Sequence, residues 1–165
     1  MSDIGDIRQP GETESDLVDE ETIDRMLHTS PVFGRLEPDA RDLLRKELTL
    51  RVARRGDVLM RAGDQADGLY LLGSGRVQVL YVNDDGTETA VNELGRGEVI
   101  GEMSLLTDRP RSATIIALRD SHLLFLSTEA FTRVVRAHPD ALRAVSTALV
   151  ERFLALRRSA AATSP

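Results

Sequence analysis

The sequence contains no cysteine and no tryptophan, and only three of its 165 residues are histidines. Without cysteine the chain cannot form disulfide bonds or thiolate metal sites. His28, His122 and His138 are far apart in the sequence, so we expect surface or half-buried histidines and no metal centre. No apolar run approaches membrane-spanning length, and the polar first residues are unlike a signal peptide. These absences favour a cytoplasmic protein.

Nucleic-acid binding and catalysis also lack support in the sequence. The net charge of −6 argues against a non-specific polyanion binder. Gly95, Gly97 and Gly101 depart by one residue from the dinucleotide-binding fingerprint, and Gly73-Ser74-Gly75 is not a nucleophile elbow. No nucleophile, base and orienting group occur together, so we expect that this segment is not an enzyme.

The first part of the chain predicts an acidic arm followed by two helices. Residues 1–19 are rich in acidic and small polar residues, which is typical of a disordered arm. Apolar residues at 23, 26 and 27 predict a helix over about Glu20–Leu27. Pro38 suits a first-turn position and predicts a second helix that reaches about Leu48.

The middle of the chain, from about residue 48 to residue 126, has a strand pattern. Short apolar-alternating runs are separated by turns rich in glycine and aspartate, and Asn83-Asp84-Asp85-Gly86 is typical of a hairpin. Many short strands at regular spacing predict a sandwich or barrel rather than a parallel sheet.

Two helices are predicted after the strands. Ser127 is a suitable N-cap for the first, which His138-Pro139 ends, and the second runs from Asp140 to about Arg158. Residues 159–165 read as a linker or tail. The last helix carries an apolar stripe that either covers the strands or pairs with a second copy, and its spacing favours neither. The stripe consists of Leu142, Val145, Leu149, Phe153 and Leu156.

The segment from Gly101 to Thr114 holds the most informative pattern. It sets a carboxylate, Glu102, nine residues before a guanidinium, Arg111. A carboxylate can accept hydrogen bonds from ribose hydroxyls, and a guanidinium binds phosphate in a bidentate, charge-assisted way. Backbone N–H groups at the start of a short helical turn can add phosphate donors. The pattern is therefore suited to holding a sugar and a phosphate together.

This segment resembles the phosphate-binding cassette of the cyclic nucleotide-binding domain family, which includes catabolite activator proteins and regulatory subunits of protein kinase A. The resemblance lies in Gly101-Glu102-Met103-Ser104-Leu105 and Arg111-Ser112-Ala113-Thr114, and it extends from about residue 30 to residue 157. It implies a mainly β fold with flanking helices, an eight-stranded antiparallel, jelly-roll-like β-roll with N-terminal helices and two C-terminal helices. The domain would span 20–158, with the roll at about 48–126 and the C-terminal helices at about 127–158.

The resemblance also implies roles for individual residues. Glu102 would accept the ribose 2′-hydroxyl, Arg111 would bind the phosphate, and Gly101 would let the backbone approach the phosphate. Taken alone, Glu102 could be a solvated loop glutamate. Arg111 could be a surface arginine paired with Asp108, a role equally open to Arg109.

Further residues complete the implied site. Met103 and Ser104 would present backbone N–H groups to the phosphate, and the Ser112 hydroxyl would bond the phosphate or a guanine amino group, with Ala113 following in the motif. The other implied residues are Val79, Val91 and Leu94 in an apolar slot for the base, Arg152 reaching back from the last helix, and Phe153 or Arg157 as a cap on the base.

The resemblance implies a bacterial regulatory domain that binds cAMP in preference to cGMP, and we expect it to use no other cofactor and no metal. Ligand binding would act through the C-terminal helices on an attached effector beyond residue 165, such as a patatin-like phospholipase or another enzyme. A homodimer through 140–158 is a further expectation. A catabolite-activator-type regulator would need a helix-turn-helix, for which only 159–165 remain, and the intact Glu102 and Arg111 argue against a degenerate roll that binds nothing.

Overall fold

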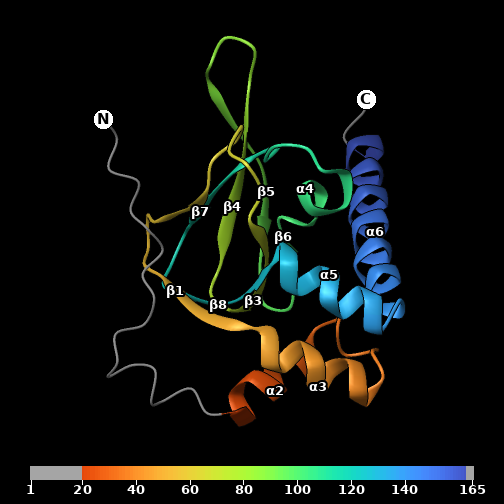
Figure 1. Cartoon of the computed structure of the whole chain (residues 1–165). Coiled ribbons are helices and arrows are strands. Elements are labelled where there is room, and N and C mark those ends of the chain that lie inside the picture. The colour runs from red at the N-terminus through yellow and green to blue at the C-terminus, as the bar shows by residue number, and fades with distance from the viewer. Residues whose placement is uncertain (1–19, 163–165) are drawn as a thin grey trace.

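The computed structural model describes residues 20–162 (Figure 1). The predicted arm 1–19 and the last residues, 163–165, lie outside the described residues. Two N-terminal helices, α2 (Glu20–Thr29) and α3 (Pro38–Glu47), stand where the sequence placed them. Pro38 lies in the first turn of α3, where its missing N–H breaks no helical hydrogen bond.

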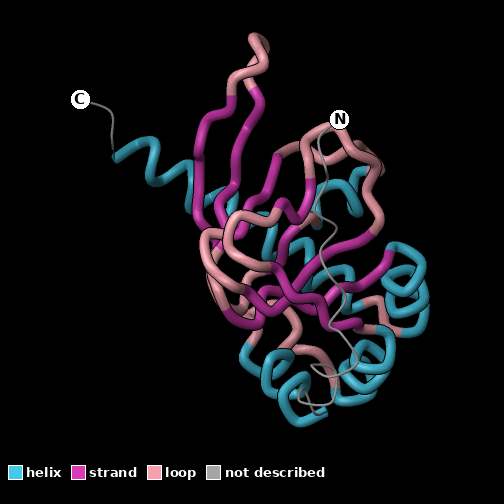
Figure 2. The backbone as a smooth tube through the Cα atoms, turned by 90° about the vertical axis from the view of Figure 1, so that its left-hand side faces the viewer, coloured by secondary structure: helices cyan, strands magenta, loops and turns pink. Residues whose placement is uncertain are grey.

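Over the described residues, eight strands form two antiparallel four-stranded sheets. They are β1 (Thr49–Ala53), β2 (Val58–Met60), β3 (Gly68–Ser74), β4 (Val77–Val82), β5 (Glu88–Leu94), β6 (Val99–Ile100), β7 (Thr114–Ala117) and β8 (Ser121–Ser127). One sheet has the order β1-β8-β3-β6 and the other β2-β7-β4-β5. The predicted antiparallel β-roll is confirmed. The β4–β5 hairpin extends beyond the rest of the roll (Figures 1 and 2).

The core has two parts, and strand β3 contributes to both. Leu69 and Leu71 pack with the helices, whereas Tyr70 and Leu72 face the other core cluster, between the sheets. Successive residues of a strand point to opposite faces, so β3 is buried on both sides. Strand β8 repeats this pattern with Leu124 against the helices. These continuous apolar runs are the signal of a strand buried on both faces.

Helices α5 (Thr128–Ala137) and α6 (Asp140–Ala162) complete the described chain. Ser127 caps α5 as predicted, because its Oγ accepts the Ala130 N–H at 3.1 Å. Helix α6 continues to Ala162, so the prediction of a helix end near Arg158 and a linker from 159 was wrong for 159–162. Alanine is the strongest helix former, and this run of small residues continues the helix.

The apolar stripe of α6 is partly buried and partly exposed. Val145 is fully buried in the helical cluster and Leu149 is half-buried, whereas Leu142 is 41% and Phe153 62% exposed. The side chain of Leu156 lies outside what the structure describes. The first half of α6 therefore packs on the fold, and several apolar side chains of the helix remain exposed.

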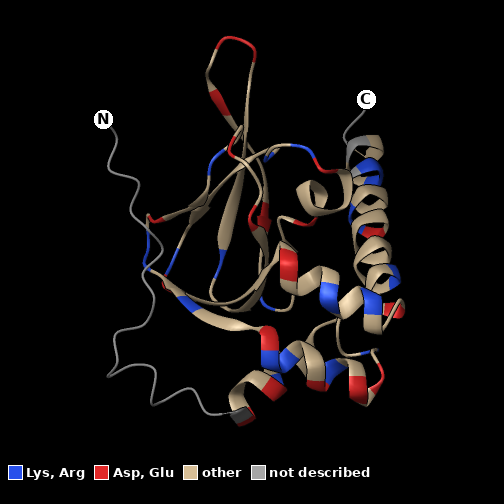
Figure 3. Ribbon diagram, in the orientation of Figure 1, with Lys and Arg blue, Asp and Glu red and all other residues tan. Residues whose placement is uncertain are grey.

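Charged residues lie mainly on the helices, the turns and the tip of the β4–β5 hairpin, while the strands of the roll carry few (Figure 3). Among the described residues, no helix combines the length and apolar character needed to cross a membrane. The same residues contain no group of three or more His, Asp or Glu side chains placed to hold a metal ion.

Candidate functional site

A cavity of about 530 Å³ opens between strands β4 and β5, the short helix α4 (Glu102–Thr107) and helix α6. Its volume lies in the range of small-molecule sites. The lining includes eleven of the residues that the sequence predicted for ligand binding, namely Val79, Val91, Leu94, Gly101, Glu102, Met103, Ser104, Arg111, Ser112, Ala113 and Arg152. Side chains from distant parts of the chain thus meet around one space.

Gly101 fixes the start of helix α4. Its φ of 85° lies in the left-handed region that glycine adopts without strain. A Cβ at this position would collide with the guanidinium of Arg111 and press on Met60. Asp108 ends α4 with a φ of 54°, which aspartate tolerates better than most residues. The cassette backbone is therefore set by two residues suited to unusual conformations.

Glu102 is 3% exposed, so the alternative of a solvated loop glutamate was wrong. Its carboxylate accepts a hydrogen bond of 2.5 Å from Arg152 Nη1, and the other terminal nitrogen of Arg152 donates to the carbonyl of Val99. Burial raises the pKa of the Glu102 carboxyl above its ordinary value, and the Arg152 guanidinium opposes that rise. Helix α6 thus supplies the charge partner of the cassette carboxylate.

Arg111 is 4% exposed and is held by three acceptors. Its Nη1 donates to the carbonyl of Gly101 at 3.0 Å, while Nη2 donates to the carbonyl of Gly68 at 2.7 Å and to Asp67 Oδ1 at 2.9 Å. The ion-pair partner is therefore Asp67, and the alternative pairing with Asp108 was wrong. A guanidinium fixed this way loses little freedom when an anion binds.

The two side chains form an unusual pair of buried charges. Among the side chains that the structure describes, Glu102 and Arg111 are the only buried charged ones. Fully buried charges are rare because desolvation is costly, and each one here is compensated from another element. Buried ion pairs of this kind add little to the stability of the fold. Buried charges with compensating partners are typical of binding sites.

The opposite half of the cavity is apolar. Leu94 is buried, Val79 half-buried, and Val91 is exposed at the mouth. Phe153 also lines the cavity, while Arg157 is exposed and is not in the lining. The predicted apolar slot is therefore present beside the cassette.

Seven lining residues went unpredicted, although most of them follow from strand pairing. Ile115 of β7 pairs with both Met60 and Val79, and Tyr81 follows Val79 by two positions on the same face of β4. The full set is Met60, Tyr81, Asn92, Ile100, Ile115, Leu149 and Val150. Strand periodicity could have supplied Tyr81, whereas Leu149 and Val150 depend on how α6 docks.

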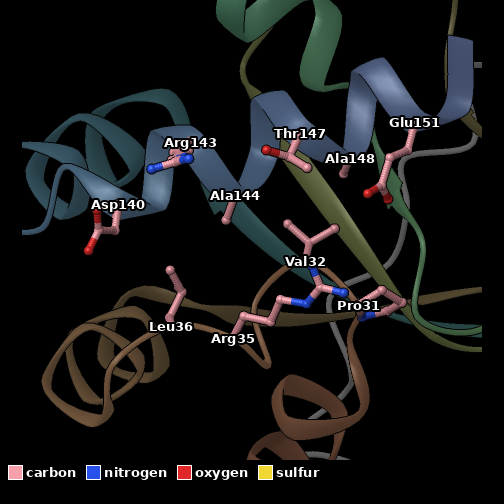
Figure 4. Close-up of a pocket in the computed structure, with 10 residues that line it drawn as sticks. All are labelled: Pro31, Val32, Arg35, Leu36, Asp140, Arg143, Ala144, Thr147, Ala148 and Glu151. Atoms are coloured by element: carbon pink, nitrogen blue, oxygen red, sulfur yellow. The ribbon is translucent and has the colours of Figure 1, made fainter. Parts of the chain in front are cut away.

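A second cavity, of about 330 Å³, lies between helix α6 and the segment that joins α2 to α3 (Figure 4). Val32 and Leu36 lie on one side of it and Ala144 and Ala148 on the other. Its charged residues are all exposed, and none of the predicted ligand-binding residues lines it.

Comparisons with known proteins identify relatives of this chain. A model of the cyclic nucleotide-binding domain family matches residues 50–138, more than half of the chain. The chain is 36% identical over 110 residues to the cyclic AMP receptor protein of Thermus thermophilus, covering 67% of this chain and 51% of that protein. It is 34% identical over 99 residues to patatin-like phospholipase domain-containing protein 7 of Rattus norvegicus, covering 60% of this chain and 7% of that protein.

A solved structure also matches this chain. The crystal structure of the Thermus thermophilus catabolite activator protein matches with a TM-score of 0.70 and 32% identity, covering 79% of this chain and 61% of that chain. The chain spans about half the length of the receptor protein and a small part of the phospholipase relative.

Proposed function

This chain belongs to the cyclic nucleotide-binding domain family, and on that premise we propose that its larger cavity binds a cyclic nucleotide, with cAMP preferred to cGMP. The observation that carries the proposal is the buried charge pair. Glu102 and Arg111 stand at one end of a cavity whose other end is apolar. A cyclic nucleotide carries matching groups, since its ribose hydroxyl and its phosphate anion are joined to the flat aromatic ring of the base.

Each part of the nucleotide has a counterpart in the cavity. The carboxylate of Glu102 accepts a hydrogen bond from the ribose 2′-hydroxyl, and the guanidinium of Arg111 binds the phosphate. Gly101 leaves room for the Arg111 guanidinium next to the backbone, since a Cβ there would collide with it. The base then lies over β4 and β5, against Val79 and Leu94. No second cofactor and no metal enter this proposal.

The contact between Arg152 and Glu102 gives a route for regulation. Arg152 belongs to α6 and holds the carboxylate that the ribose would engage. A ligand at Glu102 therefore changes the partner of Arg152 and shifts the balance between positions of α6, provided that it binds those positions unequally. We propose that this segment regulates an attached effector and does not itself catalyse a reaction.

The effector proposed here is an enzyme. The similarity to a patatin-like phospholipase domain-containing protein supports an enzyme effector beyond residue 165. The net charge of −6 supports a domain that does not bind nucleic acid itself. We propose a cytoplasmic location for the chain, and a homodimer through 140–158.

Isothermal titration calorimetry with cAMP and cGMP tests the binding proposal. The matched pair of variants is Arg111→Ala and Arg109→Ala, because Arg109 is exposed and lies outside the cavity lining. We expect saturable binding by the wild type and by Arg109→Ala, and a loss of at least about a hundredfold in Arg111→Ala. Absence of heat and of any thermal shift with both nucleotides would overturn the proposal.

A further inference from the structure

Asn92 is a polar residue on the inner side of the roll, in the apolar half of the larger cavity. It is half-buried on β5, opposite Val79 of β4. Asparagine is disfavoured in strands, and an apolar residue at this position would pack better against Val79 and Leu94. Apolar packing therefore does not explain why an amide is there.

A register shift places Asn92 in the cavity. Val79 pairs with Asn92 but the next residue, Leu80, pairs with Ala90, so Val91 is an extra residue in β5. Neighbours in a regular strand point to opposite faces, yet Val91 and Asn92 both line the cavity. A bulge of this kind redirects side chains, and such bulges are common beside binding sites.

The Nδ2 group of Asn92 is available to donate hydrogen bonds. Its Oδ1 accepts the backbone N–H of Glu93 at 2.9 Å, while its Nδ2 makes no hydrogen bond within the described part of the chain. At the other end, the hydrogen-bonding side chains are those of the cassette and of Arg152 on α6; the cassette supplies Glu102, Ser104, Arg111 and Ser112. On the strand side the only other such side chain in the described lining is Tyr81, 44% exposed at the mouth.

We propose that Asn92 reads the base, donating a hydrogen bond from Nδ2 to a ring nitrogen of adenine. This inference rests on the proposed function, because the cassette must first hold the sugar and phosphate so that the base lies over β4 and β5. Adenine presents ring nitrogens that accept, next to an exocyclic amine that donates. An asparagine amide complements that pair of groups, as it does in nucleic-acid recognition.

The exchange Asn92→Asp tests the donor without changing the size of the side chain. An ionised carboxylate only accepts, so it loses the bond to an adenine ring nitrogen and can instead accept from the N1–H and amino group of guanine. We expect the ratio of cAMP affinity to cGMP affinity to fall by about tenfold. Gln78→Glu is the matched control, because it makes the same amide-to-carboxylate change on β4 outside the cavity lining.

A second measurement uses altered ligands. Among the 1-deaza, 3-deaza and 7-deaza analogues of cAMP, we expect one to bind the wild type about tenfold more weakly than cAMP. That analogue and cAMP should bind Asn92→Leu equally well, since the variant no longer has a donor to lose. This pair of results identifies the ring nitrogen that Asn92 contacts.

The outcomes separate this inference from the proposed function. An unchanged cAMP-to-cGMP ratio in Asn92→Asp, or the same ratio change in Gln78→Glu, would overturn the role of Asn92 while Arg111-dependent binding still stands. Equal deaza penalties in wild type and Asn92→Leu would do the same. If the wild type binds no cyclic nucleotide, the proposed function fails and the assignment of Asn92 fails with it.

Discussion

At the scale of single residues, Gly101 combines a positive φ with close contact to a residue of the proposed site. A Cβ there meets both a left-handed φ and the Arg111 guanidinium, whereas a Cβ on Gly86 meets the same kind of φ with nothing within 4 Å. We expect Gly86→Ala to lower stability by about 1–2 kcal/mol with unchanged affinity for cAMP. Gly101→Ala should show a similar loss of stability plus at least about a tenfold loss of affinity.

Chemical denaturation and calorimetry of these two variants measure both quantities. Equal affinity in Gly101→Ala and Gly86→Ala would mean that the close approach of Gly101 to Arg111 is unimportant for the ligand. The comparison isolates this contact because both glycines adopt nearly the same positive φ.

Glu102 predicts how binding depends on pH. Burial raises the pKa of its carboxyl, so the folded chain holds this proton more tightly than the unfolded chain. The contribution of Glu102 to the free energy of unfolding is therefore greatest at low pH, and it falls as pH rises from the ordinary pKa to the raised one. The ribose hydroxyl needs the ionised form as acceptor, so affinity for cAMP should weaken as pH falls through the raised pKa.

Calorimetric titrations at stepwise lower pH check this dependence. Glu102→Gln should bind cAMP weakly at every pH and should lack the acid-side decline, because its amide does not titrate. If the variant declines in parallel with the wild type, another group is responsible.

At the scale of elements, the connection between helix α6 and the cassette rests on Arg152. Arg152 forms a 2.5 Å ion pair with the buried carboxylate of Glu102, and removing the guanidinium leaves that carboxylate without this partner. We expect Arg152→Ala to destabilise the fold by about 1–3 kcal/mol and to speed amide hydrogen exchange in the second half of α6. Arg158→Ala, an exposed residue of the same helix, should do neither.

Denaturation curves and hydrogen-exchange mass spectrometry measure these effects. Unchanged exchange in α6 of Arg152→Ala would show that the helix is held by apolar packing alone, and the proposed regulatory route would lose its basis.

Elements were predictable from sequence where local pattern decides them. The alternation in β4 and β5 and the apolar runs of β3 and β8 indicated the strands, and the cassette motif indicated Glu102 and Arg111. The partners of those two charges were harder. Asp67 is separated from Arg111 by 44 residues, and only the folded roll brings them together.

Other features depend on tertiary packing and were missed for that reason. The bulge at Val91 arises from how β4 pairs with β5, and regular alternation assigns Asn92 or Val91, but not both, to the cavity. The small residues in the last turn of α6 suit a helix as well as a linker, so the sequence alone predicted a linker there. The division of the α6 stripe into buried and exposed parts depends on where the helix docks.

At the scale of the whole molecule, exposed apolar residues gather on helix α6. Within the described chain, half of the large apolar side chains that are strongly exposed belong to this helix, namely Leu142, Val150, Phe153 and Leu154. Leu142, Leu149 and Phe153 recur at intervals of seven and four, which is the spacing of a helix that pairs with another helix. We therefore predict a concentration-dependent homodimer that pairs α6 with its twin.

Sedimentation velocity over a range of protein concentrations tests this dimer. Leu142→Glu should shift the equilibrium to monomer, because it places a charge in the seam without touching either cavity. Val82→Glu is the matched control, since Val82 is 45% exposed, similar to Leu142, but lies on the β4–β5 hairpin. Equal dissociation in both variants would place the contact on the roll, and a wild type that stays monomeric at every concentration would leave α6 as a face reserved for another part of the protein.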